Sequence, residues 1–204
     1  MRHVSAPASA RRRLARLLPL AVLALAACLG PRTDLSTFFL LSSPVPAAVG
    51  APVPASVGLG PLTFPAYLDR PQIVTRLSDD ELALAETERW AEPLATNLLR
   101  TLEENLERLL PGSSYVDYPW YPAEAPDYAV ALDVRRFEVD ASGAVVLDVT
   151  WRLDGGDARL DSRAARISEQ ADGPGRAAAV AAHSRALAAL SQEIAEAVRR
   201  AAGR

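Results

Sequence analysis

The chain has one cysteine, two histidines and no lysine among its 204 residues. A single cysteine, Cys28, cannot form a disulfide within the chain, and metal sites need several histidine, cysteine or carboxylate ligands at regular spacings. Only His183 lies beyond the first 27 residues, and no Gly-x-Ser-x-Gly segment or phosphate-binding glycine loop is present. The sequence therefore predicts no catalytic residue, no metal site and no bound cofactor.

The one cysteine lies at the end of a segment typical of a secretory signal. Closely spaced arginines precede an apolar run over residues 17–27, which ends in Leu25-Ala26-Ala27-Cys28. An aliphatic residue and two small residues before a cysteine form a bacterial lipobox, in which the thiol accepts diacylglycerol and the cysteine becomes the new N-terminus. The apolar run is too short to cross a bilayer, which needs roughly 20 residues. We therefore expect a lipoprotein signal peptide at 1–27 and lipidation at Cys28; an ordinary secretory signal and a retained anchor are the alternatives.

The lipobox also predicts where the protein lies. Several acyl chains on Cys28 would hold the domain in membrane lipid, because each buried CH₂ contributes about 0.8 kcal/mol. The next residue is Leu29, at a position where an aspartate would favour retention at the inner membrane. We therefore expect an outer-membrane lipoprotein facing the periplasm. Residues 28–36 are then a lipidated tether, and residues 37–204 are long enough for a single domain with its own core.

Charge excludes one class of partner. Beyond residue 27 the chain carries 17 basic and 25 acidic side chains. An acidic domain is poorly suited to binding nucleic acid, so we expect no nucleic-acid partner.

Alternating apolar residues and turn signals predict strands, and apolar stripes at helical spacing predict two helices. The expected strands cover residues 38–41, 57–64, 72–77, 81–90, 128–139, 145–153 and 159–169; the helices cover residues 94–110 and 176–202. Leu82 and Leu84 alternate with alanines, a pattern typical of a sheet with one buried face. Residues 42–56 are rich in proline and predict an extended loop.

Two details of the later strands carry further predictions. The apolar phase slips by one residue at Arg135-Arg136, which indicates a β-bulge. The strand at 159–169 is rich in arginine and glutamate, which favours an edge position. Together the elements predict an α+β fold: a two-layer sandwich with a mainly antiparallel sheet and two amphipathic helices on one face.

Two segments of the chain are more distinctive than its fold class. Tyr67-Leu68-Asp69-Arg70-Pro71-Gln72-Ile73-Val74 is followed by Arg89-Trp90-Ala91-Glu92-Pro93-Leu94, which leads into a helix with Asn97-Leu98 and Asn105-Leu106. With the lipobox, the early strand at 38–41 and the late helix at 186–195, the chain resembles the PqiC (YmbA-like) family of auxiliary lipoproteins of ABC-type and MCE-type transport systems. It departs from the family in its long 42–56 loop and in His183, where a larger apolar or aromatic residue is expected.

The resemblance implies a function by position and contact rather than by catalysis. It implies a domain on the periplasmic side of the outer membrane that assembles into a ring. The ring would dock a periplasm-spanning MCE-domain protein that carries lipid between membranes, in support of membrane integrity. Two other classes remain as alternatives: a periplasmic lipid carrier that encloses its ligand, and an envelope hydrolase.

Eight residues are candidates for a structural role or for partner contact: Tyr67, Asp69, Arg70, Arg89, Trp90, Glu92, Trp120 and Tyr121. Asp69 or Arg70 is expected to pair with Arg89 or Glu92, because the crossover at 65–71 leads into the hairpin that carries both. The aromatic loop with Trp120 and Tyr121 either contacts a neighbouring subunit or transport partner, or covers the sheet.

Overall fold

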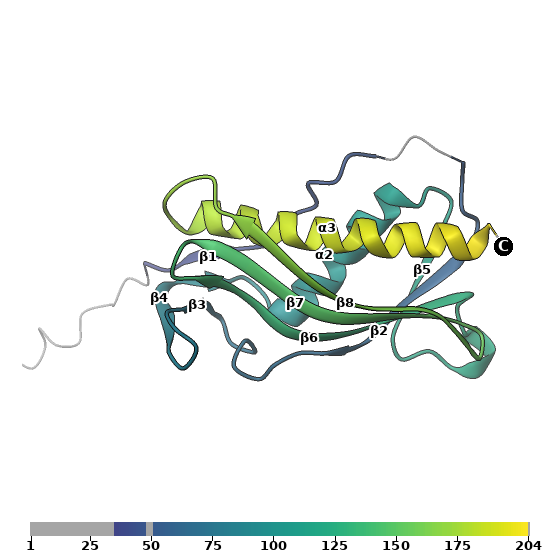
Figure 1. Ribbon diagram of the computed structural model, residues 1–204, viewed down its shortest axis with the longest axis horizontal. Helices are drawn as coiled ribbons and strands as arrows, with labels where there is room; N and C mark the ends of the chain where they lie inside the picture. The colour runs from purple at the N-terminus through teal and green to yellow at the C-terminus, as the bar shows by residue number, and fades with distance from the viewer. Residues whose placement is uncertain (1–34, 48–50, 204) are drawn as a thin grey trace, which may run out of the picture. The chain divides into compact units, whose positions relative to one another are not determined.

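The computed structural model describes residues 35–47 and 51–203 (Figure 1). The expected signal peptide and the lipidation site at Cys28 lie outside the described residues. The elements are, in chain order, β1 (Thr37–Phe39), β2 (Ser56–Thr63), β3 (Gln72–Arg76), β4 (Leu82–Trp90), α2 (Leu94–Leu109), β5 (Ser114–Asp117), the 3₁₀ turn η1 (Pro122–Glu124), β6 (Tyr128–Asp140), β7 (Ala144–Gly155), β8 (Ala158–Gln170) and α3 (Arg176–Ala202).

The eight strands form one mixed sheet that does not close on itself. The long strand β6 pairs with β7 on one side, and on the other side with β2 near its start and with β3 at its end. The longest ladders, β6–β7 and β7–β8, are antiparallel, whereas β1–β4, β2–β5, β2–β6 and β3–β6 are parallel. The α+β class is confirmed, with more parallel pairing than a mainly antiparallel sheet implies.

Two local predictions about the strands are also confirmed. The β6–β7 register shifts between Val134 and Arg136, where the apolar phase of the sequence slips. β8 pairs with β7 alone among the described strands and is therefore an edge of the sheet. On the side of β6 away from β7, the sheet runs through β3 and β4 to an edge at β1, and through β2 to an edge at β5.

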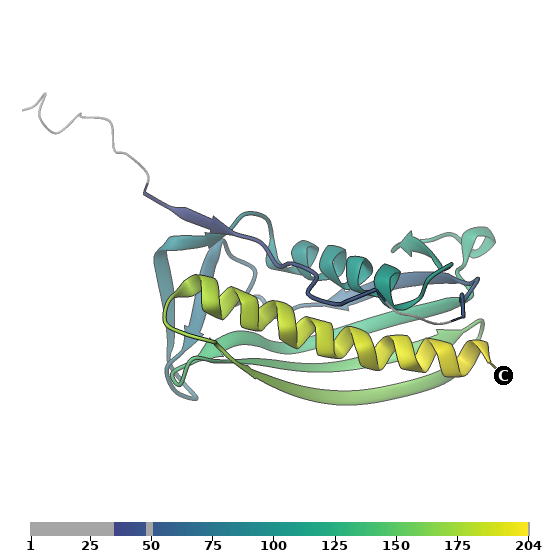
Figure 2. The same cartoon turned by 90° about the horizontal axis from the view of Figure 1, so that it is seen from above.

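Both helices lie side by side on the same face of the sheet (Figure 2). The leucine stripe of α2 is buried, as its spacing predicts. The face of α3 toward α2 contains alanine and serine, and Asn105 Nδ2 of α2 donates a 2.9 Å hydrogen bond to Ser191 Oγ of α3. Small residues on one helix let the two helices approach closely, and this amide bond fixes their contact.

Two features of the fold differ from what the pattern alone suggests. Leu82 and Leu84 of β4 are 37% and 39% exposed, while Ala85, which follows Leu84, is buried. Alternation gives the period of a strand and does not say which face is buried. The proline-rich loop contains no helix or strand over its described residues 42–47 and 51–55, yet Val45 and Val53 are buried against the domain.

Candidate functional site

Four of the eight candidate residues line one groove. Asp69, Arg70, Trp90 and Glu92 surround a space of about 380 Å³ together with Phe38 of β1. The parallel pairing of β1 with β4 places Phe38 opposite Arg89, which brings the start of the domain to a segment 51 residues later. Phe38 is 59% exposed at the groove. The groove thus combines an exposed aromatic ring with charged groups of both signs.

The floor of the groove is part of the packed core. Trp90 is buried, and its ring makes an edge contact with His183 of α3 at 5.4 Å between centroids. Phe137 lies on the imidazole as well, at 5.0 Å. His183 Nδ1 donates a 2.8 Å hydrogen bond to the carbonyl of Ala179, and burial lowers the pKa of His183 to about 4. At neutral pH the imidazole is therefore an uncharged member of an aromatic cluster in the core.

The ion pair expected at this groove is not formed. Glu92 accepts from Arg100 of α2 at 3.0 Å, and Arg100 also bonds Glu104. Neither Asp69 nor Arg70 forms an ion pair within the described residues, and Arg70 Nε has no hydrogen-bond partner there. The prediction was wrong because Arg100, in the second turn of the following helix, supplies the cation that pairs with Glu92. Arg70 thus lines the groove without an ion pair among the described residues, and its Nε atom is buried.

Tyr67 belongs to a different cluster, beneath the crossover. Its hydroxyl donates a 2.7 Å hydrogen bond to Glu138 Oε2, while Arg76 and Arg136 bond Oε1 of the same carboxylate at 2.7 and 2.9 Å. The side chain of Glu138 is fully buried. Burial alone would raise the pKa of Glu138, but the hydrogen bonds from Arg76, Tyr67 and Arg136 hold it below its usual value.

This cluster joins β3, β6 and the crossover, and its role is structural. No sequence pattern indicated Glu138, because a glutamate in a strand is normally read as solvent-facing. After the phase slip at Arg135-Arg136, Phe137 and Val139 face the core, and alternation places Glu138 on the other face of the strand, where the Tyr67 hydroxyl bonds it.

Trp120 and Tyr121 lie away from the groove, in the loop beyond β5 at the opposite end of the sheet from β1 (Figure 1). Trp120 is half-buried and packs so closely on β2 that a Cβ atom at Gly58 would lie 2.7 Å from its ring. Tyr121, in contrast, is 74% exposed. Trp120 therefore covers the sheet, and Tyr121 is the residue of the pair that is free to contact a partner.

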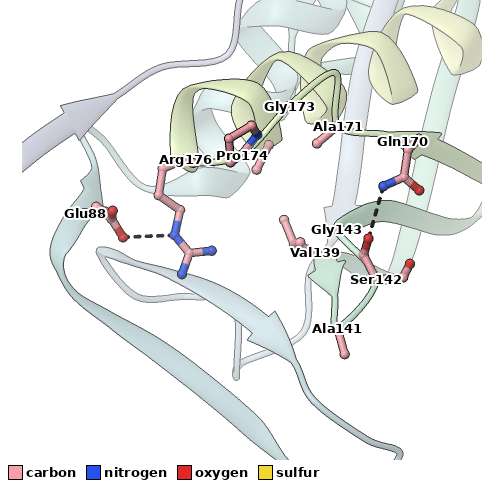
Figure 3. A pocket seen from close by; sticks show the side chains of 12 residues that line it. Glu88, Val139, Ala141, Ser142, Gly143, Gln170, Ala171, Gly173, Pro174 and Arg176 are labelled. Atoms are coloured by element: carbon pink, nitrogen blue, oxygen red, sulfur yellow. Dashed lines mark hydrogen bonds and ion pairs between the residues drawn. The ribbon is translucent and has the colours of Figure 1, made fainter.

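A second hollow, of about 690 Å³, lies where α3 begins beside the β6–β7 turn (Figure 3). Arg176 Nε bonds Glu88 Oε2 at 2.9 Å and Arg176 Nη1 bonds Thr75 Oγ1 at 2.8 Å, so its charge is already paired. Across the hollow, Gln170 Nε2 donates to the Ser142 carbonyl at 3.1 Å. These contacts tie the α3 start to β3 and β4, and the β8 end to the β6–β7 turn.

No group of three histidine, cysteine, aspartate or glutamate side chains among the described residues is arranged to hold a metal ion. Neither α2 nor α3 is long and apolar enough to cross a membrane. The described surface carries two exposed aromatic side chains that could contact a partner: Phe38 beside Arg70 at one end of the sheet, and Tyr121 at the other end.

Comparison with known proteins agrees with this description. The chain is 30% identical over 93 residues to the intermembrane transport lipoprotein PqiC of Escherichia coli K12, and equally so to that of Shigella flexneri. The matched segment is 46% of this chain and 48% of those proteins, so the chain spans about half the length of the curated relatives it matches.

Two solved structures share the fold. An uncharacterised protein superposes with a TM-score of 0.67 at 23% identity, covering 79% of this chain and 97% of the other. A Xanthomonas campestris protein also gives 0.67, at 22% identity, covering 78% and 93%. The sequence profile of the ABC-type transport auxiliary lipoprotein component matches residues 39–195, which span nearly the whole domain. The chain belongs to the family of ABC-type transport auxiliary lipoproteins.

Proposed function

We propose that the protein is a lipid-anchored, non-enzymatic subunit of an envelope system that transports lipid between membranes. Acylated Cys28 would hold it in the outer membrane with its domain in the periplasm. There it would form a ring and dock an MCE-domain protein that spans the periplasm. The observation that carries the proposal is the family match over residues 39–195, since an auxiliary transport component acts by contact and is not an enzyme class.

The anchor and the groove are close along the chain, which supports a role at a membrane. Seven peptide units separate Cys28 from Leu35, and an extended chain of that length reaches at most about 25 Å. Phe38 follows within three residues of Leu35 and stands in the groove with Arg70. A partner that approaches the membrane would meet this end of the domain early.

A lipid carrier is the less supported alternative. A carrier needs an interior apolar cavity, and the space between helices and sheet is filled here by the domain's own side chains. The fully buried side chains at this layer include Leu98, Leu102, Leu106, Trp151 and Leu187. The grooves of about 690, 610, 520 and 380 Å³ along the described residues, by contrast, are each lined in part by charged side chains.

Genetic epistasis tests the proposal. The gene for this chain and the gene for the MCE-domain protein of the same cell are deleted singly and together, and sensitivity to detergents is measured. A shared pathway predicts that the double deletion is no more sensitive than the stronger single deletion. Additive sensitivity, or no effect from loss of this chain, would reject the assignment to that transport system.

A further inference from the structure

Charge is distributed unevenly between the two sides of the sheet. Residues 35–127 carry 13 acidic and 5 basic side chains, whereas residues 128–203 carry 11 acidic and 10 basic ones. The first segment supplies β1 to β5 and α2, on one side of β6; the second supplies β7 and β8 on the other side. The sequence asymmetry therefore becomes a difference between two opposite edges of the domain.

The acidic edge is formed by α2 and β5. Glu103 and Glu107 of α2 and Asp117 of β5 form no ion pair within the described residues. Burial raises the pKa of Glu103, and the negative charges of Asp117, Glu107 and Glu104 raise it further. Carboxylates that repel one another in this way are stabilised when a cation from another molecule is placed between them.

A groove of about 610 Å³ adjoins these carboxylates. Its apolar lining includes Leu59, Leu62, Leu99 and Tyr118, and Arg100 is the one cation among its lining residues. Arg100 is already bonded to Glu92 and Glu104. The groove thus combines an apolar surface with unpaired negative charge, which suits the long methylene stem and the guanidinium of an arginine.

The opposite edge supplies such arginines. Arg159, Arg163 and Arg166 project from β8, whose outer backbone edge pairs with no described strand. The side chain of Arg159 is 64% exposed and its nearest carboxylate, Asp154, is 3.8 Å away. Arg163 is paired with Asp161, and Arg166 forms no ion pair within the described residues. Arg159 and Arg166 are therefore the guanidinium groups of this edge that are weakly paired or form no ion pair among the described residues.

The strand directions fit a cyclic assembly. β5 runs parallel to β2 and β6, and the two antiparallel ladders from β6 through β7 return β8 to the same direction. If β8 of one copy lies beside β5 of the next, all copies point the same way. Their tethers then leave from the same end, as anchoring in one membrane requires. Contacts between unlike edges are heterologous, and they close into a ring when the rotation between neighbours permits.

We propose that copies of this chain associate head to tail, with the arginine-bearing β8 edge of one copy seated against the acidic α2–β5 edge of the next. This inference rests on the ring in the proposed function and names its contact surfaces. The apolar lining of the groove supplies contact area, and the opposite charges select the register and exclude like edges from pairing.

Charge reversal tests the contact. One variant carries Glu103→Arg and Asp117→Arg, so that both of its edges are basic; the other carries Arg159→Glu and Arg166→Glu, so that both edges are acidic. The mature lipoproteins are purified in detergent and their mass is measured by sedimentation velocity, with circular dichroism melts to establish folding. Asp79→Arg with Asp80→Arg, in the exposed β3–β4 turn, is the matched control for the first variant.

We expect the wild type and the control variant to be oligomeric, and each edge variant alone to dissociate at a concentration at least tenfold higher. An equimolar mixture of the two edge variants should assemble again, because every contact in an alternating ring then joins opposite charges. Wild-type assembly should also weaken as salt is raised from 0.1 to 1 M, as screening demands.

Folded edge variants that assemble as well as the wild type would overturn these contact surfaces and leave the transport assignment intact. The same holds if the mixture fails to assemble while each variant is folded. A monomeric wild type would overturn both the contact and the ring. The deletion experiment on detergent sensitivity is scored separately, so failure of the transport role is distinguished from failure of the contact.

Discussion

Tyr67 and Glu138 lie 71 positions apart in the sequence and are joined by a 2.7 Å hydrogen bond. The bond ties the crossover between β2 and β3 to the central strand β6. Burial raises the pKa of Tyr67 to about 12, and the hydrogen bond to Glu138 contributes to the rise. The guanidinium of Arg76 lies over the Tyr67 ring, 5.6 Å from its centroid, and bonds the same carboxylate. The conformation of the conspicuous crossover is thus fixed by a residue that sequence patterns did not indicate.

The first prediction concerns this buried carboxylate. Glu138→Ala leaves Arg76 and Arg136 without their partner and should lower the free energy of unfolding by about 3 kcal/mol, the lower end for a broken buried pair, because both arginines keep some solvent contact. Tyr67→Phe removes one hydrogen bond and should cost about 1 kcal/mol. Urea unfolding measures the free energy of unfolding of both variants.

Asp172→Asn, which breaks an exposed pair with Arg185, is the control and should change stability by less than about 1 kcal/mol. Equal effects for Glu138→Ala and the control would contradict the structural role of the cluster.

The second prediction concerns pH. His183 has a pKa of about 4 in the folded protein and an ordinary value of 6.5 in the unfolded chain. Between those values the unfolded chain binds the proton more readily, so stability is complete above pH 6.5 and falls as the pH is lowered toward 4. The loss should reach about 2 kcal/mol at pH 5, at 1.36 kcal/mol per pH unit.

His183→Phe keeps an aromatic ring between Trp90 and Phe137 and removes the titration. Thermal melts from pH 7 to pH 5 should therefore show a flatter profile for the variant than for the wild type. Parallel profiles would mean that another group causes the acid sensitivity. The buried Glu138 acts at lower pH: its depressed pKa makes its contribution present above its usual range near 4.5 and lost as the pH falls below it.

The third prediction concerns the contact of Gly58 with Trp120. A Cβ atom at Gly58 would lie 2.6 Å from Pro126 and 2.7 Å from the Trp120 ring, so Gly58→Ala should destabilise the domain by about 1–3 kcal/mol through overpacking. Trp120→Ala should itself lower the melting temperature, because the half-buried ring covers β2. In the double variant the alanine has more room, and its cost should shrink; a double-mutant cycle measures this coupling. Strict additivity would show that the two residues do not share the contact.

Some tertiary features leave a local pattern in the sequence and can be predicted from it. The leucine stripe of α2 predicts its buried face, and the phase slip at Arg135-Arg136 predicts the bulge in β6. The β1–β4 pairing cannot be predicted in this way, because parallel contacts between distant segments depend on the path of the chain and leave no periodic signal. That pairing is what brings Phe38 to the groove.

The candidate site was predicted in part for the same reason. Grouping Asp69 and Arg70 with Trp90 and Glu92 was correct in space. The expected ion pair is not formed, because Glu92, just before α2, pairs with Arg100 of that helix, and the sequence alone does not show which cation lies within reach of Glu92. His183 departs from the larger apolar or aromatic residue that the family resemblance implies, and its neutral ring packs against Trp90 and Phe137 as an aromatic ring would.

The fourth prediction tests the anchor. Cys28→Ser removes the thiol that would accept diacylglycerol, so the precursor should remain unprocessed or the protein should be missing from the outer-membrane fraction. Membrane fractionation followed by mass spectrometry of the N-terminus measures both outcomes. A variant that fractionates and is processed like the wild type would contradict the lipoprotein assignment of the signal.

The last prediction separates scaffold from contact surface at the groove. Arg70 forms no ion pair within the described residues, so Arg70→Ala should change the free energy of unfolding by less than about 1 kcal/mol. Trp90→Ala is the contrast: it empties a buried site against His183 and should cost about 3–5 kcal/mol.

If the groove receives the transport partner, Arg70→Ala should nevertheless reduce co-purification of the co-expressed MCE-domain protein several-fold, and Phe38→Ala should do the same because Phe38 is exposed beside it. Unfolding in urea and pull-down from solubilised membranes are measured on the same preparations. Weak unfolding effects together with unchanged co-purification would remove the groove as the docking surface and direct attention to Tyr121 at the opposite end of the sheet.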